Sequence, residues 1–553
     1  MPKIEVSRQD LFAQARIEDP GDEKLADLLS LVKGEIDTSD GDMLKLELND
    51  TNRPDLWCVE GVARTLRCWN SGAERHLNEL PEPDMDIFVD PDLDEVRPFV
   101  AAFTASGWAP DQRELDALID VQEKLATSFG KNRKTAGAGF YRLDDIEFPI
   151  SYRAASPETS FVPLGCEKEM TLSEILTETE TGRTYAHLLE GKDLLPLLED
   201  SGGNILSFPP ILNSQTTGRV RAGDSRLFCE VTGTDWETVQ LSATILACNL
   251  QDRGAVILPI RINYPESYPG KTVVTPVIFS DRLTASMESI HEVLGMDISP
   301  ESAQKALLRM DYASVELDGT GVTGILPPYR RDGIHAVDMI EDIVISLGFS
   351  YFEPLLPEQF TLGKCAPIED LADAVRILLA GARCEEILRP VLTSRAKVKN
   401  LTRTPSDPIS IANPMTAEYG VVRNTLLPGL LEVESTSAHA AYPHRIFETG
   451  EVLTACEDGY CRTDILLACL ICGNKADFGD AHSIIGSLCH SRAVGLSLAD
   501  IDDERFIPGR CASIIIDGRV SGVIGELHPA VLDNWGISSP ASAFEIALSS
   551  LKG

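Results

Sequence analysis

Apolar residues recur at helical spacing in the stretch between Leu326 and Phe349. Steps of three and four place one set of side chains on a single face of a helix: Ile334, Val337, Ile340, Val344 and Leu347. Asp332-Gly333 precedes this repeat and Gly348 follows it. Because Asp accepts hydrogen bonds from free helix N–H groups and Gly favours helix ends, the pattern predicts a helix with Asp332 as N-cap.

The first hundred residues combine alternating and helical patterns. Residues 43–48 alternate apolar and polar side chains, as a half-buried strand does. Residues 60–67 predict a helix after an Asn/Asp/Pro turn, with Asp55 as the expected N-cap. Residues 80–94 are rich in Pro and Asp, which predicts a linker. We therefore expect a first α+β domain over residues 1–94.

Residues 95–265 predict a second, mixed α/β domain. The pattern indicates helices at 111–129 and 240–251, and strands at 96–105, 136–141, 227–232 and 255–262. Within the apolar run 204–214 stands Pro209-Pro210. Proline lacks the N–H that a sheet ladder needs, so this run is predicted to shape a pocket rather than a central strand. The alternation at 227–232 puts Glu230 and Thr232 on one face.

The rest of the chain predicts two further domains. Residues 268–349 indicate helices at 280–294 and 299–310, a hairpin at 312–327 and a last helix, which is a winged-helix-like order. The glycines between the hairpin strands match a dinucleotide-binding pattern, but no helix follows them to receive a pyrophosphate, so a hairpin loop is expected. Residues 360–553 predict one antiparallel sheet backed by helices. The fold class is thus α+β multidomain.

Charge and cysteine content limit the classes of protein. A net charge of −37 argues against general coating of nucleic acid, although a local basic patch or a basic partner is compatible with it. The 13 cysteines are scattered, and the one CxxC, Cys469–Cys472, lies in a strand-like apolar run, so a reducing, cytoplasmic setting is expected and a zinc site is not. The first residues, MPKIEVSRQDLF, lack the apolar core of a signal peptide, and no apolar run is long enough to span a membrane.

Acidic residues cluster beside the apolar stripe of the helix described first. Asp338, Glu341 and Asp342 lie within helical reach of one another, and Asp332 can join them from the cap. Such a cluster needs a cation or a basic neighbour unless it is solvated. A solvated helix flank, a Mg²⁺ site with all-oxygen ligands and a docked basic surface all fit the spacing.

Several motifs in order along the whole chain resemble the family of phenylalanyl-tRNA synthetase β subunits, in the archaeal/eukaryotic form. They are NDTNRPDL with EGVAR near the N-terminus, SFPPILNS with EVTGTD, PPYRRD followed by VDMIEDI and GF, and NPMTAEYGVVRNTLLPGLL with FETGEV and GELHP.

The resemblance implies a subunit of phenylalanine–tRNA ligase in an (αβ)2 heterotetramer that also binds tRNA(Phe). The α subunit carries the site that joins phenylalanine to tRNA with ATP as substrate. The family's metal pattern matches Asp332, Asp338, Glu341 and Asp342, where it implies Mg²⁺ shared with the α subunit. A non-catalytic scaffold or RNA-binding paralogue is the alternative function.

The resemblance also implies an editing pocket in residues 95–265 that hydrolyses tyrosine wrongly attached to tRNA(Phe). The matching positions are Gln122, Arg133, Ser207, Asn213, Arg219, Glu230 and Thr232, with Glu230 where the family usually has aspartate. Hydrolysis needs a positioned water and hydrogen-bond donors, for which Ser207, Asn213 and Thr232 are candidates. No Ser-His-Asp set is visible.

The C-terminal sheet is expected to resemble the catalytic module of class II synthetases without its activity. Such modules hold ATP phosphates with an arginine after a glycine-spaced strand. The corresponding segment, residues 522–529, contains no arginine. Arg423, the single basic residue of the other ATP-facing segment, is interpreted as a surface or interface charge.

Overall fold

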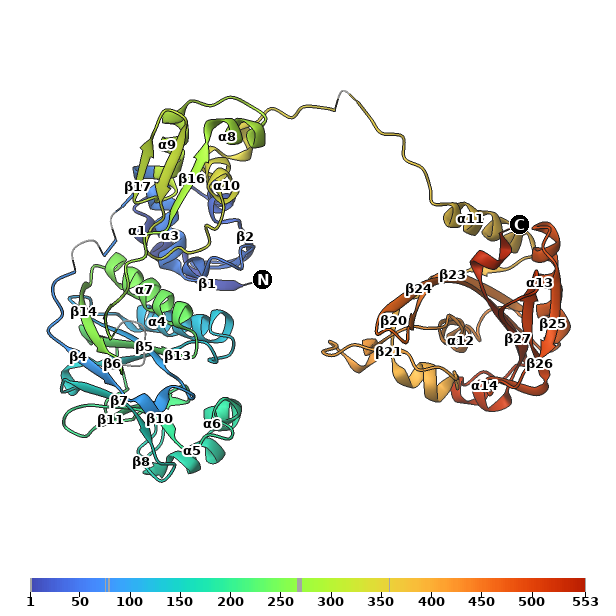
Figure 1. Cartoon of the computed structure of the whole chain (residues 1–553), viewed down its shortest axis with the longest axis horizontal. Helices are drawn as coiled ribbons and strands as arrows, with labels where there is room; N and C mark the ends of the chain where they lie inside the picture. Colours follow the sequence, from blue (N-terminus) through green and yellow to red (C-terminus); the bar gives the residue numbers. More distant parts are fainter. Residues whose placement is uncertain (1, 75, 78–79, 266–270, 358, 553) are drawn as a thin grey trace. The chain divides into compact units, whose positions relative to one another are not determined.

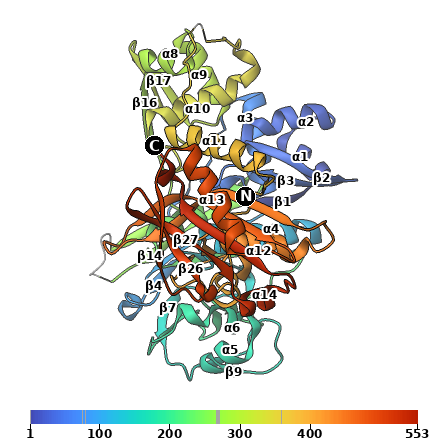
Figure 2. The ribbon, with the colours of Figure 1, turned by 90° about the vertical axis from the view of Figure 1, so that its right-hand side faces the viewer.

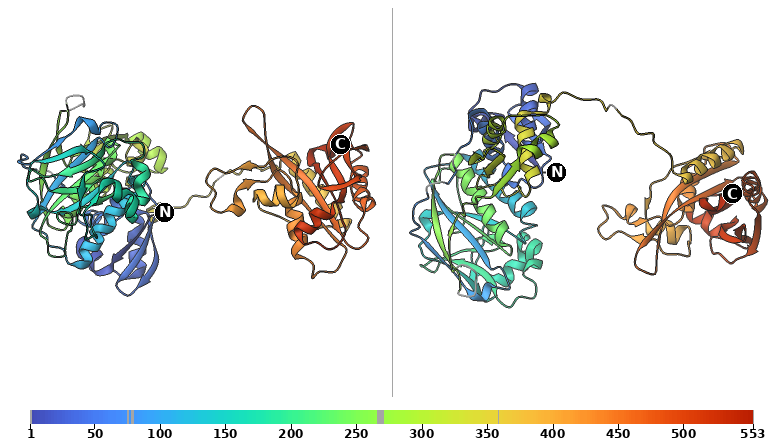
Figure 3. Two further views of the ribbon diagram at one scale, coloured as in Figure 1. Left: turned by 90° about the horizontal axis from the view of Figure 1, so that it is seen from below. Right: turned by 45° about the horizontal axis from the view of Figure 1, so that its top comes forward.

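The chain forms two compact units, one up to Leu355 and the other from Leu356 (Figure 1). The structure is a computed structural model that describes residues 2–74, 76–77, 80–265, 271–357 and 359–552. The described residues between η7 (Phe349–Tyr351) and α11 (Pro367–Gly381) contain no helix or strand and run as an extended trace in Figure 3.

The N-terminal part of the first unit is a three-stranded antiparallel sheet covered by helices. Its elements are β1 (Lys3–Ser7), α1 (Arg8–Ala15), α2 (Asp22–Leu29), β2 (Gly34–Asp40), β3 (Met43–Leu48) and α3 (Val59–Ser71), with strand order β1-β3-β2. The strand expected at 43–48 is confirmed. The expected N-cap Asp55 is wrong: Cys58 caps α3, because the buried Asp55 carboxylate instead binds the side chain of Arg53.

A second small sheet with three helices follows later in the same unit. It consists of β16 (Arg282–Ser286), α8 (Met287–Leu294), α9 (Pro300–Arg309), β17 (Ser314–Leu317), β18 (Gly321–Ile325) and α10 (Ala336–Leu347). The glycine-rich loop is a hairpin turn, as expected. The helix expected from residue 280 is wrong in its first half, because Leu283 and Ala285 alternate with exposed residues and pair with β18. This part shares one hydrophobic core with the N-terminal sheet.

Helix α10 buries a different face from the apolar stripe that its sequence predicts. His335, not Asp332, is the N-cap, and it forms a capping box with Asp338. Ile334 precedes the helix and is 88% exposed, and Val337 is 49% exposed. The buried side is formed by Met339, Ile340, Asp342, Ile343, Ile345 and Ser346. The expected stripe is therefore wrong at its first two members.

Between these two parts of the chain lies a large mixed sheet. Its order is β12-β11-β10-β7-β4-β14-β5-β13-β6, with β15 paired to β14. The strands are β4 (Asp86–Val89), β5 (Phe99–Ser106), β6 (Gly137–Arg142), β7 (Ile150–Ala155), β10 (Leu195–Glu199), β11 (Ile205–Phe208), β12 (Leu212–Asn213), β13 (Arg226–Gly233), β14 (Val256–Asn263) and β15 (Thr272–Thr275). The linker expected over 80–94 is wrong at β4, which pairs parallel with β7 and β14 and buries Ile87.

Helices α4 (Gln112–Lys124) and α7 (Trp236–Asp252) pack on one side of β5, β13 and β6. Alternate residues of β13 point to opposite faces of the sheet. Cys229 and Val231 pack against these helices, and Phe228 packs on the other face, in the core that includes Ile87. Glu230 and Thr232 share the parity of Phe228, so they lie on the face opposite α7.

The second unit is a seven-stranded sheet with helices on both faces. Its order is β19-β23-β24-β28-β27-β26-β25, with β19 parallel to β23 and the other pairs antiparallel. The bounds are β19 (Glu385–Glu386), β23 (His444–Ala455), β24 (Cys461–Cys472), β25 (Leu496–Asp500), β26 (Phe506–Ile516), β27 (Arg519–Leu527) and β28 (Ala541–Ala547). The expected antiparallel sheet is confirmed except at β19, and β26 and β27 form a hairpin across Asp517-Gly518.

Both faces of this second sheet are buried. Helices α11 and α13 (Phe478–Ser491) cover one face, and α12 (Leu427–Thr436) and α14 (Pro529–Trp535) cover the other. Figure 2 views this unit with α13 towards the reader. On β24, Leu467, Cys469 and Ile471 pack in the core under α11 and α13. Ala468, Leu470 and Cys472 pack in the core under α12 and α14. Double-sided burial explains why β24 is a continuous apolar run rather than an alternating one.

Candidate functional site

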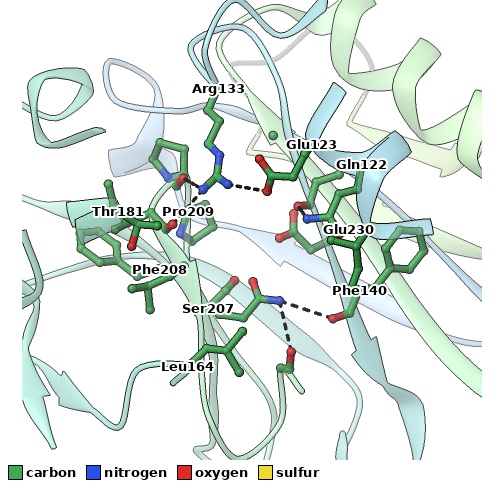
Figure 4. A pocket seen from close by; sticks show the side chains of 18 of the residues that line it. Gln122, Glu123, Arg133, Phe140, Leu164, Thr181, Ser207, Phe208, Pro209 and Glu230 are labelled. Carbon is green, nitrogen blue, oxygen red and sulfur yellow. Dashed lines mark hydrogen bonds and ion pairs between the residues drawn. The ribbon is translucent and has the colours of Figure 1, made fainter. Parts of the chain in front are cut away.

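All the positions expected to form a pocket in residues 95–265 line one cavity of about 300 Å³ in the first unit. They are Gln122, Arg133, Ser207, Asn213, Arg219, Glu230 and Thr232. Figure 4 shows this cavity with Arg133 at one end of the view and Ser207 and Leu164 at the other. Segments that are far apart in the sequence, from residue 115 to residue 232, therefore converge on one site.

Two strand pairs carry the polar residues of the cavity. Glu230 and Thr232 lie on β13, between β5 and β6. Ser207 and Asn213 are directly opposite each other on the short hairpin of β11 and β12. The two prolines form the turn of that hairpin at the end of the sheet, so the expectation that Pro209-Pro210 shapes a pocket is confirmed.

Glu230 is buried, with 3% of its surface exposed, and only one of its carboxylate oxygens has a partner. The Tyr141 hydroxyl donates to Oε1 at 2.9 Å, whereas Oε2 makes no hydrogen bond to the described residues. Burial raises the pKa of Glu230 to about 7, although the Tyr141 hydrogen bond and the Arg97 charge act in the opposite direction. Near neutral pH this carboxyl group can therefore exist in both protonation states.

Ser207 is the second polar group of the cavity whose hydrogen-bonding capacity is unused. Its Oγ is buried and makes no hydrogen bond within the part of the chain that the structure describes. Asn213 differs, because its Oδ1 accepts from Tyr141 at 3.2 Å and its amide donates weakly to the Phe140 and Gly218 carbonyls, both at 3.4 Å. An unpaired buried polar atom is unfavourable, so Ser207 Oγ and Glu230 Oε2 are positions where a ligand would restore hydrogen bonds.

Arg133 connects three segments around the cavity. Its guanidinium donates to the Pro210 carbonyl at 3.1 Å and the Ile211 carbonyl at 2.9 Å, and it forms an ion pair with Glu123 at 2.6 Å. It also lies over the ring of Tyr185, at the end of α6 (Glu180–Tyr185), 4.5 Å from the ring centre. Gln122 donates to the Ala138 carbonyl at 2.8 Å. Arg133 therefore fixes the shape of the cavity more than it offers a free charge.

Apolar side chains form the remaining wall of the cavity. They come from α4, from β6, from the loop after β8 (Ser160–Phe161) and from the loop before β13. The residues are Leu115, Leu118, Ile119, Phe140, Leu164 and Val220. A mostly apolar cavity of this volume with a few unsatisfied polar atoms suits an aromatic ring that carries a hydroxyl group.

Sequence analysis missed several residues that make this site possible. Gly137 and Gly139 pair with Thr232 and Glu230 across β6 and β13. A Cβ at Gly139 would lie 2.6 Å from the Tyr141 hydroxyl and 2.8 Å from Glu230 Oε1. Alternating glycines inside a strand are the signal that could have found them, since they mark a close approach. Tyr141 and Arg97 carry no such local signal.

The four acidic residues of the family's metal pattern border one small cavity of about 30 Å³. Arg330 donates to both oxygens of Asp332, at 3.0 and 2.6 Å, and contacts Asp342 at 3.0 Å. Although burial opposes it, the charges of Arg330 and Arg53 hold the pKa of Asp332 well below its usual range.

The other two acids of this pattern have different partners. Asp338 accepts from the Ile334 and His335 backbone N–H groups, both at 2.7 Å, and Glu341 pairs with Lys33 at 2.8 Å. Among the described residues, no three His, Cys, Asp or Glu side chains are grouped so that they could hold a metal ion. Basic side chains therefore answer three of the four acids, Asp332, Glu341 and Asp342.

Arg423 in the second unit is not a surface charge, so that expectation is wrong. It is 5% exposed and pairs with the buried Glu448 at 2.7 Å. It also donates to the Arg389 and Glu451 carbonyls. A buried carboxylate needs a counter-charge, which explains the position of Arg423. In a separate property of the fold, no helix among the described residues is long and apolar enough to cross a membrane.

Two regions of the chain match known protein families, and the chain as a whole matches known proteins. Residues 355–548 match the model of the phenylalanyl tRNA synthetase beta chain CLM domain, and residues 283–349 match the tRNA synthetase B5 domain. The phenylalanine–tRNA ligase beta subunit of Pyrococcus furiosus is 36% identical over 100% of both chains, and that of Borrelia recurrentis is 35% identical over 100% of both.

A crystallised N-terminal fragment of the phenylalanyl-tRNA synthetase beta subunit from Pyrococcus horikoshii matches with a TM-score of 0.60 and 34% identity. The match covers 63% of this chain and 100% of that fragment. Similarity at this level along the complete length, together with both domain matches, shows that this chain belongs to the family of phenylalanine–tRNA ligase β subunits.

Proposed function

We propose that this chain is the β subunit of a cytoplasmic (αβ)2 phenylalanine–tRNA ligase and that its cavity in residues 95–265 edits mischarged Tyr-tRNA(Phe). The α subunit then supplies the ATP-dependent attachment of phenylalanine. The large mixed sheet serves as the editing domain; it includes β4 and β15, so this domain extends beyond the expected residues 95–265 on both sides. The remaining parts of residues 1–94 and 268–349 serve as N-terminal and winged-helix-like domains, and residues 360–553 as a synthetase-like domain. The observation that carries the editing function is the pair of unsatisfied buried atoms, Glu230 Oε2 and Ser207 Oγ, in an apolar cavity of about 300 Å³.

Tyrosine and phenylalanine differ by one hydroxyl group, and the cavity can distinguish them by hydrogen bonds to that group. The phenol hydroxyl of tyrosine can donate to Glu230 Oε2 and accept from the Ser207 hydroxyl. Phenylalanine would leave both atoms buried without partners. Sites built to hydrogen-bond a substrate hydroxyl reject the analogue that lacks it by on the order of 100-fold or more. The cavity therefore favours the wrong amino acid and spares the correct product.

Hydrolysis in this cavity requires water rather than a protein nucleophile. Water adds to the ester carbonyl carbon, the bond to the ribose oxygen breaks, and free tyrosine and tRNA leave. The Thr232 hydroxyl and the Asn213 amide line the cavity, and hydrogen bonds to Arg97 and to the Phe140 carbonyl hold them in place. Held in this way, they can orient a water molecule or the ester oxygen. Holding the ester in place is the main contribution that these residues can make.

The test uses the chain assembled with its α subunit and two substrates, Tyr-tRNA(Phe) and Phe-tRNA(Phe). The unaltered complex should hydrolyse the first at least about 100 times faster than the second. Glu230→Gln and Ser207→Ala should each reduce that ratio, while ATP-dependent attachment of phenylalanine stays unchanged because that site lies on the other subunit. Arg153→Met, which removes a half-buried ion pair with Glu199 in the same sheet, is the matched control. Equal rates on both substrates in the unaltered complex would refute the editing function.

We also propose that the exposed side of α10 contacts the α subunit. Ile334 and Val337 stand in solvent beside Asp338 and Glu341 at helical spacing. Adjacent exposed apolar side chains with a polar rim are a feature of interaction surfaces. A Mg²⁺ at this place would be held by Asp338, Glu341 and their neighbours Asp332 and Asp342, which line one cavity, together with ligands from the α subunit.

Two variants of Asp338 separate the metal from the helix cap. Asp338→Asn retains an oxygen that can accept from the Ile334 and His335 N–H groups but loses the charge. Asp338→Ala loses both. If Mg²⁺ is shared here, the asparagine variant should keep the stability of the isolated chain yet lose metal from the purified α/β complex. Full metal content and full assembly in Asp338→Asn would remove the metal from this place.

The second unit is proposed to be a class II synthetase fold without synthetase activity. Its cavity of about 150 Å³ is lined by three basic residues, and each already has a carboxylate partner: Arg389 with Glu432, Lys397 with Glu418 and Arg423 with Glu448. No cation that lines this cavity is left to bind the phosphates of ATP. The isolated chain should show no phenylalanine-dependent exchange between pyrophosphate and ATP.

A further inference from the structure

Arg97 is a buried cation next to the proposed editing cavity, with 2% of its surface exposed. It lies just before β5, and Tyr152 donates to its backbone carbonyl at 2.8 Å. The hydrogen bonds of its guanidinium to described residues all go to neutral oxygens. A buried guanidinium without a directly bound carboxylate is unfavourable, so its retention calls for a specific role.

The guanidinium of Arg97 holds two residues that line the cavity. Its Nε donates to Thr232 Oγ1 at 3.0 Å and its Nη2 to the Thr232 carbonyl, so both the side chain and the backbone of Thr232 are fixed. Its Nη1 donates to the Arg133 carbonyl at 2.9 Å. Arg97 therefore links β13 to the loop before β6.

That loop needs an external support. Lys131, Asn132 and Arg133 have φ values of 50°, 55° and 63°, a run of three left-handed residues that are not glycine. L-residues rarely adopt this conformation and keep it only when surrounding contacts enforce it. The bond from Arg97 to the Arg133 carbonyl is such a contact, and it places the Arg133 side chain over the cavity. Gly137 leaves room for this bond, since a Cβ there would lie 3.3 Å from Arg97 Nη2.

Charge supplies the second link between Arg97 and the cavity. Burial lowers the pKa of Arg97 to about 10, and the fields of Tyr152 and Glu230 partly restore it, so the guanidinium is charged at neutral pH. The same field from Arg97 acts against the burial that raises the pKa of Glu230. Thr232 and Glu230 are alternate residues on one face of β13, so the guanidinium that bonds Thr232 Oγ1 lies near the Glu230 carboxylate. The two opposite charges therefore stabilise each other.

The other groups around Glu230 keep their charge state near neutral pH. Burial raises the pKa of Tyr141 on β6, Tyr152 on β7 and Cys229 on β13, so all of them stay protonated. Arg133 in the loop before β6 pairs with Glu123 at 2.6 Å. Between about pH 5 and 9, Glu230 is the group of this set whose charge changes.

We propose that Arg97 is a positioning residue of the editing cavity, whose guanidinium fixes Thr232 and the Arg133 loop and whose charge stabilises the Glu230 carboxylate. The first half rests on the proposed editing function. The second half concerns the folded chain alone and can be tested without any activity.

The charge is tested by thermal unfolding of the α/β complex between pH 5 and 9. The melting temperature of the unaltered complex is compared with that of Glu230→Gln at each pH. The difference between the two grows as the pH rises and levels off at the pKa of Glu230 in the folded state. The same comparison is repeated in the Arg97→Met background, with Arg153→Met as control. Arg97→Met should move this pH upwards by about one unit or more, because it removes a positive charge near the carboxylate. Arg97→Gln replaces Arg97→Met if the latter does not fold. An unchanged pH in the neutral variant would overturn the electrostatic role.

The positioning role of the guanidinium is tested with Arg97→Lys. Lysine keeps the positive charge but cannot hydrogen-bond Thr232 and the Arg133 carbonyl at the same time as the planar guanidinium does. This variant should leave the titration of Glu230 near its original pH and lower kcat for Tyr-tRNA(Phe) deacylation roughly 10- to 100-fold, with unchanged attachment of phenylalanine. Full deacylation by Arg97→Lys would overturn the positioning role. If even the unaltered complex deacylates no Tyr-tRNA(Phe), the editing function and the positioning role fail, and the unfolding comparison still decides the electrostatic role.

Discussion

Glu230 illustrates how one buried side chain can serve a site at a cost to the fold. Its carboxyl group lies on β13 between β5 and β6, and among the described residues only Oε1 has a hydrogen-bond partner. The glycines opposite it on β6 provide the space, and Tyr141 and Arg97 limit the penalty. A glutamine of the same shape would avoid the burial of charge, so the acid is explained by what it binds rather than by stability.

The pH dependence of stability should show this cost directly. The pKa of Glu230 rises from 4.5 to about 7 on folding, so the native state holds a proton that the unfolded state has lost between these values. The stabilising contribution is complete below about pH 4.5 and is lost as the pH rises to about 7, by about 3 kcal/mol at ~1.4 kcal/mol per unit. Glu230→Gln should therefore gain stability over the unaltered chain between pH 5 and pH 8, measured by urea unfolding. A constant difference across that range would contradict the shift.

The glycine opposite Glu230 offers an independent prediction. Gly139→Ala places a Cβ 2.6 Å from the Tyr141 hydroxyl and 2.8 Å from Glu230 Oε1, so these side chains must move. Deacylation of Tyr-tRNA(Phe) should fall at least about tenfold, since the Glu230 carboxyl group that offers Oε2 to the substrate hydroxyl is displaced together with its partner Tyr141. Gly486→Ala on α13 is the control, because an added Cβ there meets nothing within 4 Å. Equal activity of the two variants would show that the close approach at Gly139 is unimportant.

At the scale of elements, α10 joins several parts of the first unit through charge. Asp342 is buried and bound by Arg330 at 3.0 Å and by Tyr312 at 2.8 Å. Glu341, one residue earlier, is exposed and pairs with Lys33. The helix thus presents one acid to the core and the next to solvent, which its sequence alone does not reveal.

Neighbouring acids on α10 should consequently differ in their effect on stability. Asp342→Ala leaves Arg330 buried with one partner fewer and should lower the free energy of unfolding of the first unit by about 3 kcal/mol or more. Glu341→Ala breaks an exposed pair and should cost less than about 1 kcal/mol. Chemical unfolding of both variants under the same conditions decides the matter, and equal losses would refute the assigned burial.

The order of elements and the pocket residues could be predicted from the sequence, but their surroundings could not. Strong local patterns, such as the alternation in β3 or the Pro209-Pro210 run, located elements correctly because the pattern and the tertiary burial agree. Predictions failed where tertiary contacts override local preference. Asp55 and Asp332 look like helix caps, yet each is held by an arginine instead.

Long-range contacts account for the remaining errors. The first half of α10's apolar stripe is exposed because the helix packs through Met339, Ile340 and Ile343 instead. The strand β4 looks like a linker because its short apolar stretch is flanked by Pro and Asp. Arg97 has no distinctive neighbours in the sequence, and only the folded arrangement places it against Thr232 and the Arg133 loop.

At the scale of the whole chain, the two units are separate hydrophobic bodies. The cores that include β5, β13 and α7 belong to the first unit, and those around β24 belong to the second. Leu355, Leu356, Phe360 and Leu362 between them are more than four-fifths exposed, which is a high exposure for apolar side chains. Limited proteolysis of the isolated chain should cut first in this segment and release two fragments that each unfold cooperatively. Early cleavage within either sheet would contradict this division.

The cavity around Glu230 and Ser207 is proposed to remove tyrosine from tRNA(Phe). The most direct measurement is the ratio of single-turnover hydrolysis rates for Tyr-tRNA(Phe) and Phe-tRNA(Phe) by the assembled α/β complex, before and after Glu230→Gln. The structure predicts a ratio on the order of 100 or more that collapses in the variant while attachment of phenylalanine persists. No hydrolysis of either substrate, or a ratio that the substitution leaves intact, would contradict it.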